Sequence, residues 1–319
     1  MASVVPNQIG STQSIDPAEV YGTEGSIKLR IATGGAGQTG ILKALAEAFI
    51  LFTQSSKEAG PLEPFRIAWL ATDTSLSFNA LAHKAADVAI TYHPYAEKIA
   101  VQQGIAEDRV YLWRDSFNLV GPAANPAELP LGGTLSIFEL FATVFQAAVR
   151  TAESDQPVRF LSRYDKSANN ILESRIWTSI GQTPCSPWYH KFPALPKQAL
   201  EEASKLGEYT LVDRGTWCKM QNMPEIRDNM VCFKEGAIDW MEGEVSPEAG
   251  HILYGDSLGN PAHALLSPHA QHAEVARLFL HWAVWQKGGQ HVISNFKLNG
   301  MQLHGLSPRR AQELGGPLA

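Results

Sequence analysis

Two segments of the sequence place charged and polar side chains in patterns that suit the binding of an anion. In the first, FLSRYDKSANN, an apolar run is followed at once by Ser162, Arg163, Lys166 and Ser167. Cations and neutral hydrogen-bond donors at the start of a predicted helix compensate for an anion that is removed from water. The alternative interpretation of this segment is a basic turn on the protein surface.

The second segment, YTLVDRGTW, predicts an apolar strand that delivers Asp213 and Arg214 into a glycine-containing turn. A guanidinium group can donate two parallel hydrogen bonds to an oxyanion or to a carboxylate. Arg214 is therefore a candidate for binding an anion. The alternative is that Asp213 and Arg214 form a pair that only holds the loop in place.

A glycine-rich stretch near the N-terminus, IATGGAGQTG, matches the pattern G-x-G-x-x-G at Gly35, Gly37 and Gly40. It is not a Walker A loop, because Ile41 stands where that motif needs a lysine. A dinucleotide site needs an acidic residue about 20 positions further along, and the next predicted strand ends only at Asp73. A dinucleotide site is therefore the weaker interpretation, and an anion site on a glycine turn at a helix start is the alternative.

Hydroxyl groups also gather at the junction between the next predicted strand and helix, in LATDTSLSF. Thr74 and Ser75 are candidates for hydrogen bonds to a ligand, whereas hydroxyl groups at such a junction commonly cap the helix. Asp73 would repel an anion bound there unless its carboxylate points away or is paired.

Other chemistry finds little support in the sequence. The G-x-S-x-G motif of serine hydrolases is absent, and His269 and His272 lack the H-E-x-x-H pattern of a zinc site. Cys185, Cys218 and Cys232 have no C-x-x-C spacing, so we expect free thiols, with one disulfide left open for an oxidising compartment. We therefore predict no catalytic residue, no metal site and no cofactor.

The composition is that of a folded protein with a sizeable core, since 45% of the 319 residues are hydrophobic and 18% are charged. The formal net charge of -6 offers no general attraction for nucleic acid or for an anionic membrane surface. The nearest approach to a membrane span, at 135–149, contains a glutamate and is too short. We expect a core helix there, and no membrane insertion.

Residues 1–25 are expected to form a polar, mobile leader. They lack the basic start and the apolar segment of a secretory signal. The sequence therefore indicates a cytoplasmic protein, or a periplasmic or extracellular one from which an upstream signal has been removed.

Predicted strands and helices alternate along the chain, with a strand pair at 109–122, which indicates the α/β class with mainly parallel sheets. Stretches rich in proline and glycine at 121–133 and 243–262 divide the chain into three blocks. If the first and last blocks fold together, the middle block is an inserted lobe, and a ligand cleft lies between the lobes. The predicted lobes are 26–118 with 241–319, and 119–240.

The segments VRFLSRYDKSANNILESRIW and GEYTLVDRGTW resemble the TupA-type, tungstate-binding solute receptors of ABC importers. That family carries Ser-Arg-Gly-Asp-x-Ser-Gly-Thr-His and Tyr-Thr-Leu-x-Asp-Arg-Gly-Thr segments. AADVAITYH and RDSFNLVGPAANP are similar to two further segments of the family, and the resemblance covers roughly residues 26 to 308. It implies a periplasmic-binding-protein-like (type II) fold, in which two α/β lobes close on an oxyanion.

The resemblance, taken position by position, also implies which residues bind the ligand, although three family segments are altered here. The family's hydroxyl-rich first loop is Thr33-Gly34-Gly35-Ala36 in this chain, which leaves backbone N–H groups in place of side-chain donors. Its Gly-Thr-Gly turn is Asp73-Thr74-Ser75, and its Gly-Thr-His is Ala168-Asn169-Asn170. The predicted ligand-binding residues are Thr33, Gly34, Gly35, Thr74, Ser75, Ser162, Arg163, Lys166, Ser167, Arg214, Gly215 and Thr216.

These observations favour a binding protein over an enzyme. The first hypothesis is a monomeric receptor that closes on tungstate or molybdate and is served by the membrane subunits of an ABC importer. The second is an intracellular enzyme or sensor that uses the same fold on a small organic anion, such as a phosphorylated or carboxylated metabolite. The second hypothesis predicts a cleft larger than one tetrahedral ion. A weaker third hypothesis is an interaction module without a ligand.

Overall fold

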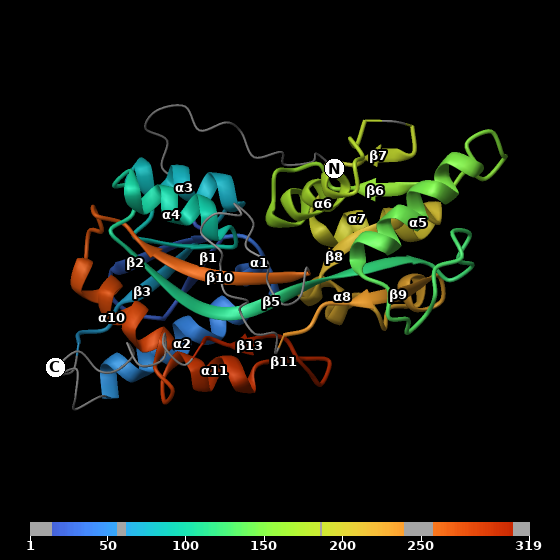
Figure 1. Cartoon of the computed structure of the whole chain (residues 1–319). Coiled ribbons are helices and arrows are strands. Elements are labelled where there is room, and N and C mark those ends of the chain that lie inside the picture. Colours follow the sequence, from blue (N-terminus) through green and yellow to red (C-terminus); the bar gives the residue numbers. More distant parts are fainter. Residues whose placement is uncertain (1–14, 56–61, 186, 239–257, 309–319) are drawn as a thin grey trace. The chain divides into compact units, whose positions relative to one another are not determined.

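The computed structural model describes residues 15–55, 62–185, 187–238 and 258–308 (Figure 1). The chain divides into two compact units, each built from strands and helices. Unit 1 consists of Met1–Leu112, Ala262–Ile293 and Ser307–Ala319, and unit 2 consists of Trp113–Pro261 and Ser294–Leu306. Each unit is therefore assembled from segments that are far apart in the sequence.

At two places the chain passes from one unit to the other within a strand. These strands are β5 (Asp108–Pro122) and β10 (Gly259–Leu266). The predicted strand pair at 109–122 is wrong, because this segment forms the single strand β5. No glycine or proline interrupts it before Gly121, so nothing forces a turn. The predicted lobe boundaries at 118/119 and 240/241 stay predictions, and the second lies outside the described residues.

The sheet of unit 1 is mixed rather than mainly parallel as predicted. Its strand order is β1-β3-β2-β4-β10. Strand β2 pairs parallel with β3 and β4, whereas β1 and β10 pair antiparallel with β3 and β4, respectively. Its other strands are β1 (Glu19–Tyr21), β2 (Ile27–Thr33), β3 (Arg66–Ala71) and β4 (Val88–Thr91).

Two of these strands lie where the sequence predicted irregular chain. Strand β1 falls within the predicted mobile leader, yet it pairs with β3 and its Tyr21 is buried. The part of the leader at 1–14 lies outside the described residues. The start of β10 falls within the predicted divider at 243–262, which contains Asn260 and Pro261. All of β10 is buried, and burial against neighbouring strands outweighs the low strand propensity of these two residues.

The core of unit 1 joins helices from opposite ends of the chain. Phe49 on α2 is fully buried and packs edge-on against Phe279 of α10, with ring centroids 5.2 Å apart. Residues 285–288 separate α10 from α11. The helices wholly or mostly in this unit are α1 (Gly35–Thr39), α2 (Ile41–Ser55), α3 (Thr74–Ala82), α4 (Pro94–Gln102), α10 (Ala273–Val284) and α11 (Gly289–Asn295).

Unit 2 also has a mixed sheet. Strand β6 pairs parallel with β7 and β8, and β5 pairs antiparallel with β8, β9 and β13. Besides β5, the strands of unit 2 are β6 (Phe160–Ser162), β7 (Tyr189–Lys191), β8 (Tyr209–Asp213), β9 (Met230–Glu235), β11 (Lys297–Leu298), β12 (Met301–Gln302) and β13 (Gly305–Leu306). Its helices are α5 (Ile137–Arg150), α6 (Ala168–Ser179), α7 (Pro196–Leu206), α8 (Arg214–Met220) and α9 (Pro224–Arg227).

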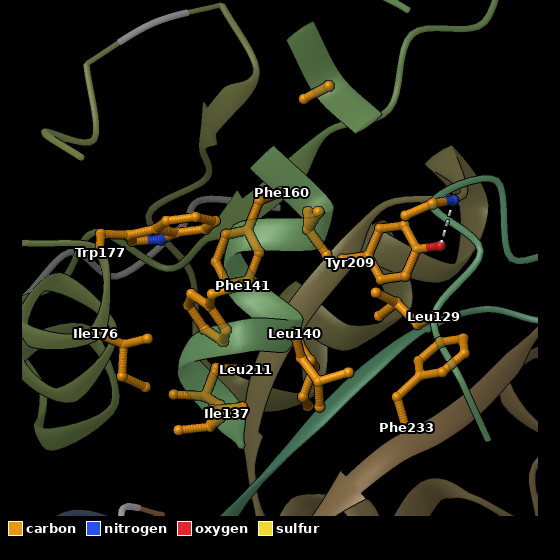
Figure 2. Close-up of a cluster of buried hydrophobic side chains, with 14 of the residues drawn as sticks. Leu129, Ile137, Leu140, Phe141, Phe160, Ile176, Trp177, Tyr209, Leu211 and Phe233 are labelled. Atoms are coloured by element: carbon orange, nitrogen blue, oxygen red, sulfur yellow. Dashed lines mark hydrogen bonds between the residues drawn. The ribbon is translucent and has the colours of Figure 1, made fainter. Parts of the chain in front are cut away.

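Aromatic side chains form much of the core of unit 2 (Figure 2). Trp177 contacts Phe141 and Phe160, with ring centroids 4.5 and 5.1 Å apart. Tyr209 belongs to the same cluster, and its hydroxyl accepts a hydrogen bond from the Ala127 N–H at 3.0 Å (Figure 2). Fully burying one large apolar side chain contributes about 1.5–3 kcal/mol. The cluster therefore holds α5 and α6 firmly against the sheet.

Parallel pairing brings the ends of neighbouring strands to the same sheet edge within each unit. In unit 1, Thr33 at the end of β2 lies opposite Ala71 at the end of β3. In unit 2, Ser162 ends β6, and Asp213 ends its parallel neighbour β8. The polar segments identified in the sequence therefore begin at one edge of each sheet.

Candidate functional site

In unit 1, the predicted first loop follows β2 directly. Thr33 is fully buried, and its Oγ1 has no hydrogen-bond partner among the residues that the structure describes. Its carbonyl accepts hydrogen bonds from Trp69 Nε1 at 2.8 Å and from the Thr72 N–H at 3.2 Å. An unpaired buried hydroxyl is costly, so Thr33 offers a donor that a ligand could satisfy.

The predicted glycine turn contains the short helix α1, for which Gly34 is the N-cap and Gly40 the left-handed C-cap, with a φ of 91°. Close packing explains two further glycines. A Cβ atom at Gly34 would lie 2.5 Å from the Thr72 carbonyl oxygen, and one at Gly37 would lie 2.0 Å from the Trp69 ring. Gly35 faces open space instead, with no atom within 4 Å of a Cβ built there.

The second predicted segment of unit 1 begins α3. Asp73 is the N-cap of this helix, and its Oδ1 accepts a hydrogen bond from the Leu76 N–H at 2.7 Å. The capping role predicted as an alternative for the hydroxyl groups is therefore filled by the carboxylate. Thr74 is buried, with 8% exposure, and Ser75 is exposed. The register of β2 with β3 brings this segment close to Thr33.

In unit 2, Ser162 is an interior residue rather than a surface donor. It is fully buried, and its Oγ accepts hydrogen bonds from the Tyr164 N–H at 3.1 Å and from Asn170 Nδ2 at 3.2 Å. The Tyr189 hydroxyl lies 2.7 Å away. Ser162 therefore holds the turn between β6 and α6 from beneath.

The same turn pairs the predicted cation with a carboxylate. Arg163 Nη2 forms an ion pair with Asp165, and Arg163 Nε donates to the Ala194 carbonyl at 3.1 Å. Asp165 also accepts a hydrogen bond from the Ser167 N–H at 3.1 Å, and Ser167 is the N-cap of α6. Lys166 is exposed to solvent. The Asp165 carboxylate thus links the Arg163 guanidinium group to the start of α6.

Two residues of this turn adopt left-handed backbone conformations that favour glycine. Tyr164 has a φ of 45° and Lys166 a φ of 62°. Tyr164 stands where the resembling family has a glycine. Such conformations cost on the order of 1–3 kcal/mol each and persist only where the surrounding structure imposes them. Here the ion pair and the Ser162 hydrogen bonds supply that constraint.

The other predicted arginine begins α8. Asp213 does not pair with it, because the Asp213 carboxylate caps this helix by accepting from Thr216 N–H and Oγ1, both at 2.8 Å. Arg214 forms an ion pair with Glu235, and its Nε and Nη2 each lie 3.4 Å from the Gln302 carbonyl oxygen. Gly215 is buried in the first turn of α8.

A cavity of about 590 Å³ in unit 2 has Arg214 in its wall. Sequence reasoning missed the other residues around it, because Arg114 sits inside β5 and Gln302 lies 88 residues from Arg214 in the sequence. The antiparallel pairing of Gly305 with Arg114 brings these segments together. The cavity is lined by Arg114, Arg214, Glu235, Gly236, Ala237, Ile238, Gln302, Gly305 and Leu306.

Unit 2 also buries ionisable groups that no sequence motif indicated. Burial raises the pKa of Glu173 to about 8. Burial and the nearby charge of Asp213 raise the pKa of Asp115 well above its usual range. Burial lowers the pKa of His304 to about 3, and neither ring nitrogen of His304 has a hydrogen-bond partner among the described residues. Such shifts concentrate at functional sites.

The structure thus gathers the predicted residues into two groups, one in each unit. Thr33, Gly34, Gly35, Thr74 and Ser75 share an edge of the unit 1 sheet. In unit 2, Ser162 ends β6, and the other predicted residues follow β6 and β8. Within the described ranges, no group of three or more His, Cys, Asp or Glu residues could hold a metal ion, and the three cysteines are free. In the same ranges, every helix is too short or too polar to cross a membrane.

Comparison with known families and proteins gives consistent results. Residues 16–284 match the family described as PBP superfamily domain. A Haloferax volcanii protein provisionally named ABC transporter anion-binding protein is 28% identical over 238 residues, which cover 75% of this chain and 62% of that protein. The tungstate-binding protein TupA of Peptoclostridium acidaminophilum is 31% identical over 136 residues, or 43% of this chain and 44% of TupA. The match thus spans less than two thirds of either relative.

A solved structure is similar over most of its length. It is a crystal structure of a periplasmic protein provisionally described as metal binding, with 41% sequence identity and a TM-score of 0.77. The similarity covers 91% of this chain and 99% of the other. Together with the two α/β units, this bears out the predicted periplasmic-binding-protein-like fold and the resemblance to TupA-type proteins.

Proposed function

Because the chain belongs to the PBP superfamily domain family, we propose that it is a solute-binding protein that binds a small oxyanion, tungstate or molybdate, for an ABC importer. The names of the Haloferax and Peptoclostridium relatives, which refer to anion binding and to tungstate binding, support this ligand class. Closure of the protein on its ligand belongs to the same proposal.

The observation that carries the proposal is the pair of guanidinium groups that follow adjacent strands in unit 2. Arg163 follows β6 and Arg214 follows β8, and each side chain is only 12% exposed. A guanidinium group so far removed from water needs an anionic partner. Asp165 and Glu235 fill that role in the structure. A bound oxyanion must therefore share these guanidinium groups with the carboxylates or take their place.

We assign the remaining ligand contacts to the residues predicted from the sequence. In unit 1, the unpaired Thr33 hydroxyl is the strongest of these candidates, because hydrogen bonding to a ligand would remove the cost of its burial. Gly34, Gly35, Thr74 and Ser75 would add backbone and hydroxyl donors around it. In unit 2, Lys166, Ser167, Gly215 and Thr216 would contribute in the same way. Ser162 would act by holding the turn, because its hydroxyl group already has hydrogen-bond partners there.

The donor chemistry favours an oxyanion over a bare metal cation. A cation would need several carboxylate, imidazole or thiolate groups, and the part of the chain that the structure describes has no cluster of three or more. Tungstate and molybdate contain a metal but present only oxygen atoms to the protein. Guanidinium, hydroxyl and N–H donors suit such a surface.

Partners and location follow from the same proposal. The membrane subunits of an ABC importer would receive the loaded protein, which we expect to act as a monomer outside the cytoplasmic membrane. The periplasmic origin of the similar solved structure supports this location.

Isothermal titration calorimetry with tungstate, molybdate, sulfate and phosphate tests the proposed function. We expect tungstate or molybdate to bind most tightly. Arg163→Gln should weaken binding at least about tenfold, because a hydrogen bond from a charged group contributes roughly 1.5–3 kcal/mol. Arg227→Gln is the matched control, since Arg227 pairs with Asp228 on an exposed surface, and should bind like the wild type. No heat from any of the four anions would contradict the proposal.

A small organic anion is the second candidate ligand. The cavity of about 590 Å³ beside Arg214 is within the range of small-molecule sites and exceeds the size of one tetrahedral ion. Arg114 and Arg214 in its wall suit a carboxylate or phosphate group. Native mass spectrometry of the freshly purified protein would reveal an organic passenger. A mass increase equal to one metal oxyanion would instead favour the first candidate.

A further inference from the structure

Behind the turn between β6 and α6, a chain of hydrogen-bonding side chains leads into the interior of unit 2. Glu173 on α6 is 1% exposed, and its Oε1 accepts a hydrogen bond from the Tyr189 hydroxyl. The same hydroxyl lies 2.7 Å from Ser162 Oγ. Ser162 Oγ in turn accepts from the Tyr164 N–H at 3.1 Å and from Asn170 Nδ2 at 3.2 Å. The chain thus connects a buried carboxyl group to the backbone of the turn.

The direction of this chain depends on whether Glu173 carries a proton, because each hydroxyl group has a single hydrogen to donate. When Glu173 is ionised, Tyr189 donates to the carboxylate and Ser162 donates to Tyr189. When Glu173 is protonated, its own O–H donates to Tyr189 and Tyr189 donates to Ser162. Because Ser162 Oγ has only two lone pairs, one of its two N–H donors in the turn is then displaced, and the Ser162 hydrogen turns to that side. The Tyr164 N–H and Asn170 Nδ2 both donate to Ser162 Oγ, and the Ser162 hydroxyl also interacts with the Glu173 carboxyl group. A Ser162 hydrogen that points towards the turn favours negative charge there.

Titratable and charged groups from β7 and from the turn face Glu173. Tyr189 faces it from β7, and Asp165 and Arg163 face it from the turn. Burial is the largest influence and, with Asp165, raises the pKa of Glu173, while Tyr189, Ser162 and Arg163 oppose this. The outcome is a pKa of about 8. Burial and the charge of Glu173 raise the pKa of Tyr189, so the phenol keeps its proton.

Glu173 also lies close enough to the turn for its charge to interact directly with a bound anion. Glu173 follows the N-cap Ser167 by six positions on α6, which is roughly 9 Å along the helix axis. Two negative charges at such a separation repel appreciably in the protein interior. Ionised Glu173 would therefore oppose an anion bound at the turn, both by its charge and by the direction of the hydroxyl groups.

We propose that Glu173 is a proton-linked positioning residue, whose protonated form directs the Tyr189 and Ser162 hydroxyl groups towards the turn that carries Arg163. Binding of an anion at this turn is then accompanied by uptake of a proton. The inference rests on the proposed function, because it assumes that the turn binds an anion. By this inference, Glu173 controls the pH dependence of binding, although it is buried and was not among the predicted site residues.

The test is calorimetric titration of the full-length protein with sodium tungstate between pH 7 and pH 9.5. The titration is repeated with sodium sulfate, because the charge of sulfate is constant between pH 7 and pH 9.5. Wild-type affinity should fall with rising pH, by up to about thirtyfold, the ratio of the protonated fractions for a pKa of about 8. Repeating the titration near pH 8 in two buffers of different ionisation enthalpy should reveal proton uptake.

Glu173→Gln keeps a donor to Tyr189 without the charge, so it imitates the protonated acid. We expect its affinity at pH 7 to lie within about twofold of the wild type, to change little up to pH 9.5, and to show no proton uptake. Glu202→Gln is the control, because it removes the same charge from the surface helix α7, and should keep the wild-type pH profile. Circular dichroism at each pH confirms that all proteins are folded.

The possible outcomes separate the inference from the proposed function. A wild-type affinity that does not change with pH, or a Glu173→Gln profile that follows the wild type, would overturn the inference and leave the proposed function standing. Absence of binding by the wild type at pH 7 would overturn the proposed function, and the inference with it.

Discussion

At the scale of single residues, close packing rather than the motif itself explains the glycines of the first loop. Trp69 donates from Nε1 to the Thr33 carbonyl, which fixes the indole ring beside α1. Gly37 lies against this ring, whereas Gly35 faces open space. The pattern G-x-G-x-x-G therefore combines a glycine required by tertiary packing with one that is not.

This contrast gives a paired prediction. Gly37→Ala should destabilise the protein by about 1–3 kcal/mol, because its Cβ would lie 2.0 Å from the Trp69 ring. Gly35→Ala should be neutral or stabilise by up to about 1 kcal/mol, since alanine favours a helix and the site is open. Urea unfolding followed by tryptophan fluorescence measures both. Equal stability of the two variants would contradict the packing explanation.

At the scale of elements, polar residues between a strand and the helix that follows it prove to be helix caps. Asp73 caps α3, Ser167 caps α6 and Asp213 caps α8. Each side-chain oxygen accepts a hydrogen bond from a backbone N–H that has no partner within its helix. The caps fix where the helices begin and hence where Arg163 and Arg214 stand.

The cap of α8 can be tested by two substitutions at one position. Asp213→Ala should cost about 1–2 kcal/mol, because it leaves the Thr216 N–H and Oγ1 without their acceptor. Asp213→Asn should cost less, since asparagine caps nearly as well. Both variants remove the same charge near Asp115, so their difference isolates the hydrogen bonding. Urea unfolding measures it, and no difference would argue against a capping role.

At the scale of the whole molecule, each unit has its own core and its own buried ionic groups. In unit 1, Glu97 is fully buried and accepts from Thr91 Oγ1 at 2.8 Å and from Arg109 Nε at 2.8 Å. His263 Nδ1 lies 3.0 Å from Glu97 Oε2. Burial raises the pKa of Glu97, but His263 and Arg109 outweigh it, so the pKa is lowered overall. The stability that this cluster supplies is therefore present above the ordinary glutamate pKa and is lost as the pH falls.

Disruption of this cluster should affect unit 1 before unit 2. Glu97→Gln should cost about 3–5 kcal/mol, because it leaves the largely buried Arg109 guanidinium without its counter-charge. Glu107→Gln removes the same charge from an exposed pair with Arg277 and should change stability by less than about 0.5 kcal/mol.

Hydrogen exchange measured by mass spectrometry distinguishes the two units. Peptides from unit 1 of Glu97→Gln should lose protection at neutral pH while those from unit 2 keep it. Equal losses throughout the chain would mean that the units unfold as one cooperative body.

Local patterns in the sequence were sufficient for much of the architecture. The apolar run before Arg163 and the strand that ends at Asp213 are short-range features, and both lie where they were predicted. Strand β10 was missed because Asn260 and Pro261 resemble turn residues, and only burial by neighbouring strands overrides that preference.

What the sequence by itself determined is many of the helix starts and strand ends, together with the family, because propensities, caps and motifs act over a few residues. Only the tertiary structure decided which partner each charged group has. Glu235 reaches Arg214 through the arrangement of the folded chain. Glu173 became a buried acid beneath the turn because α6 and β7 pack around it. Burial and ionic pairing depend on distance in space, and separation along the chain does not determine that distance.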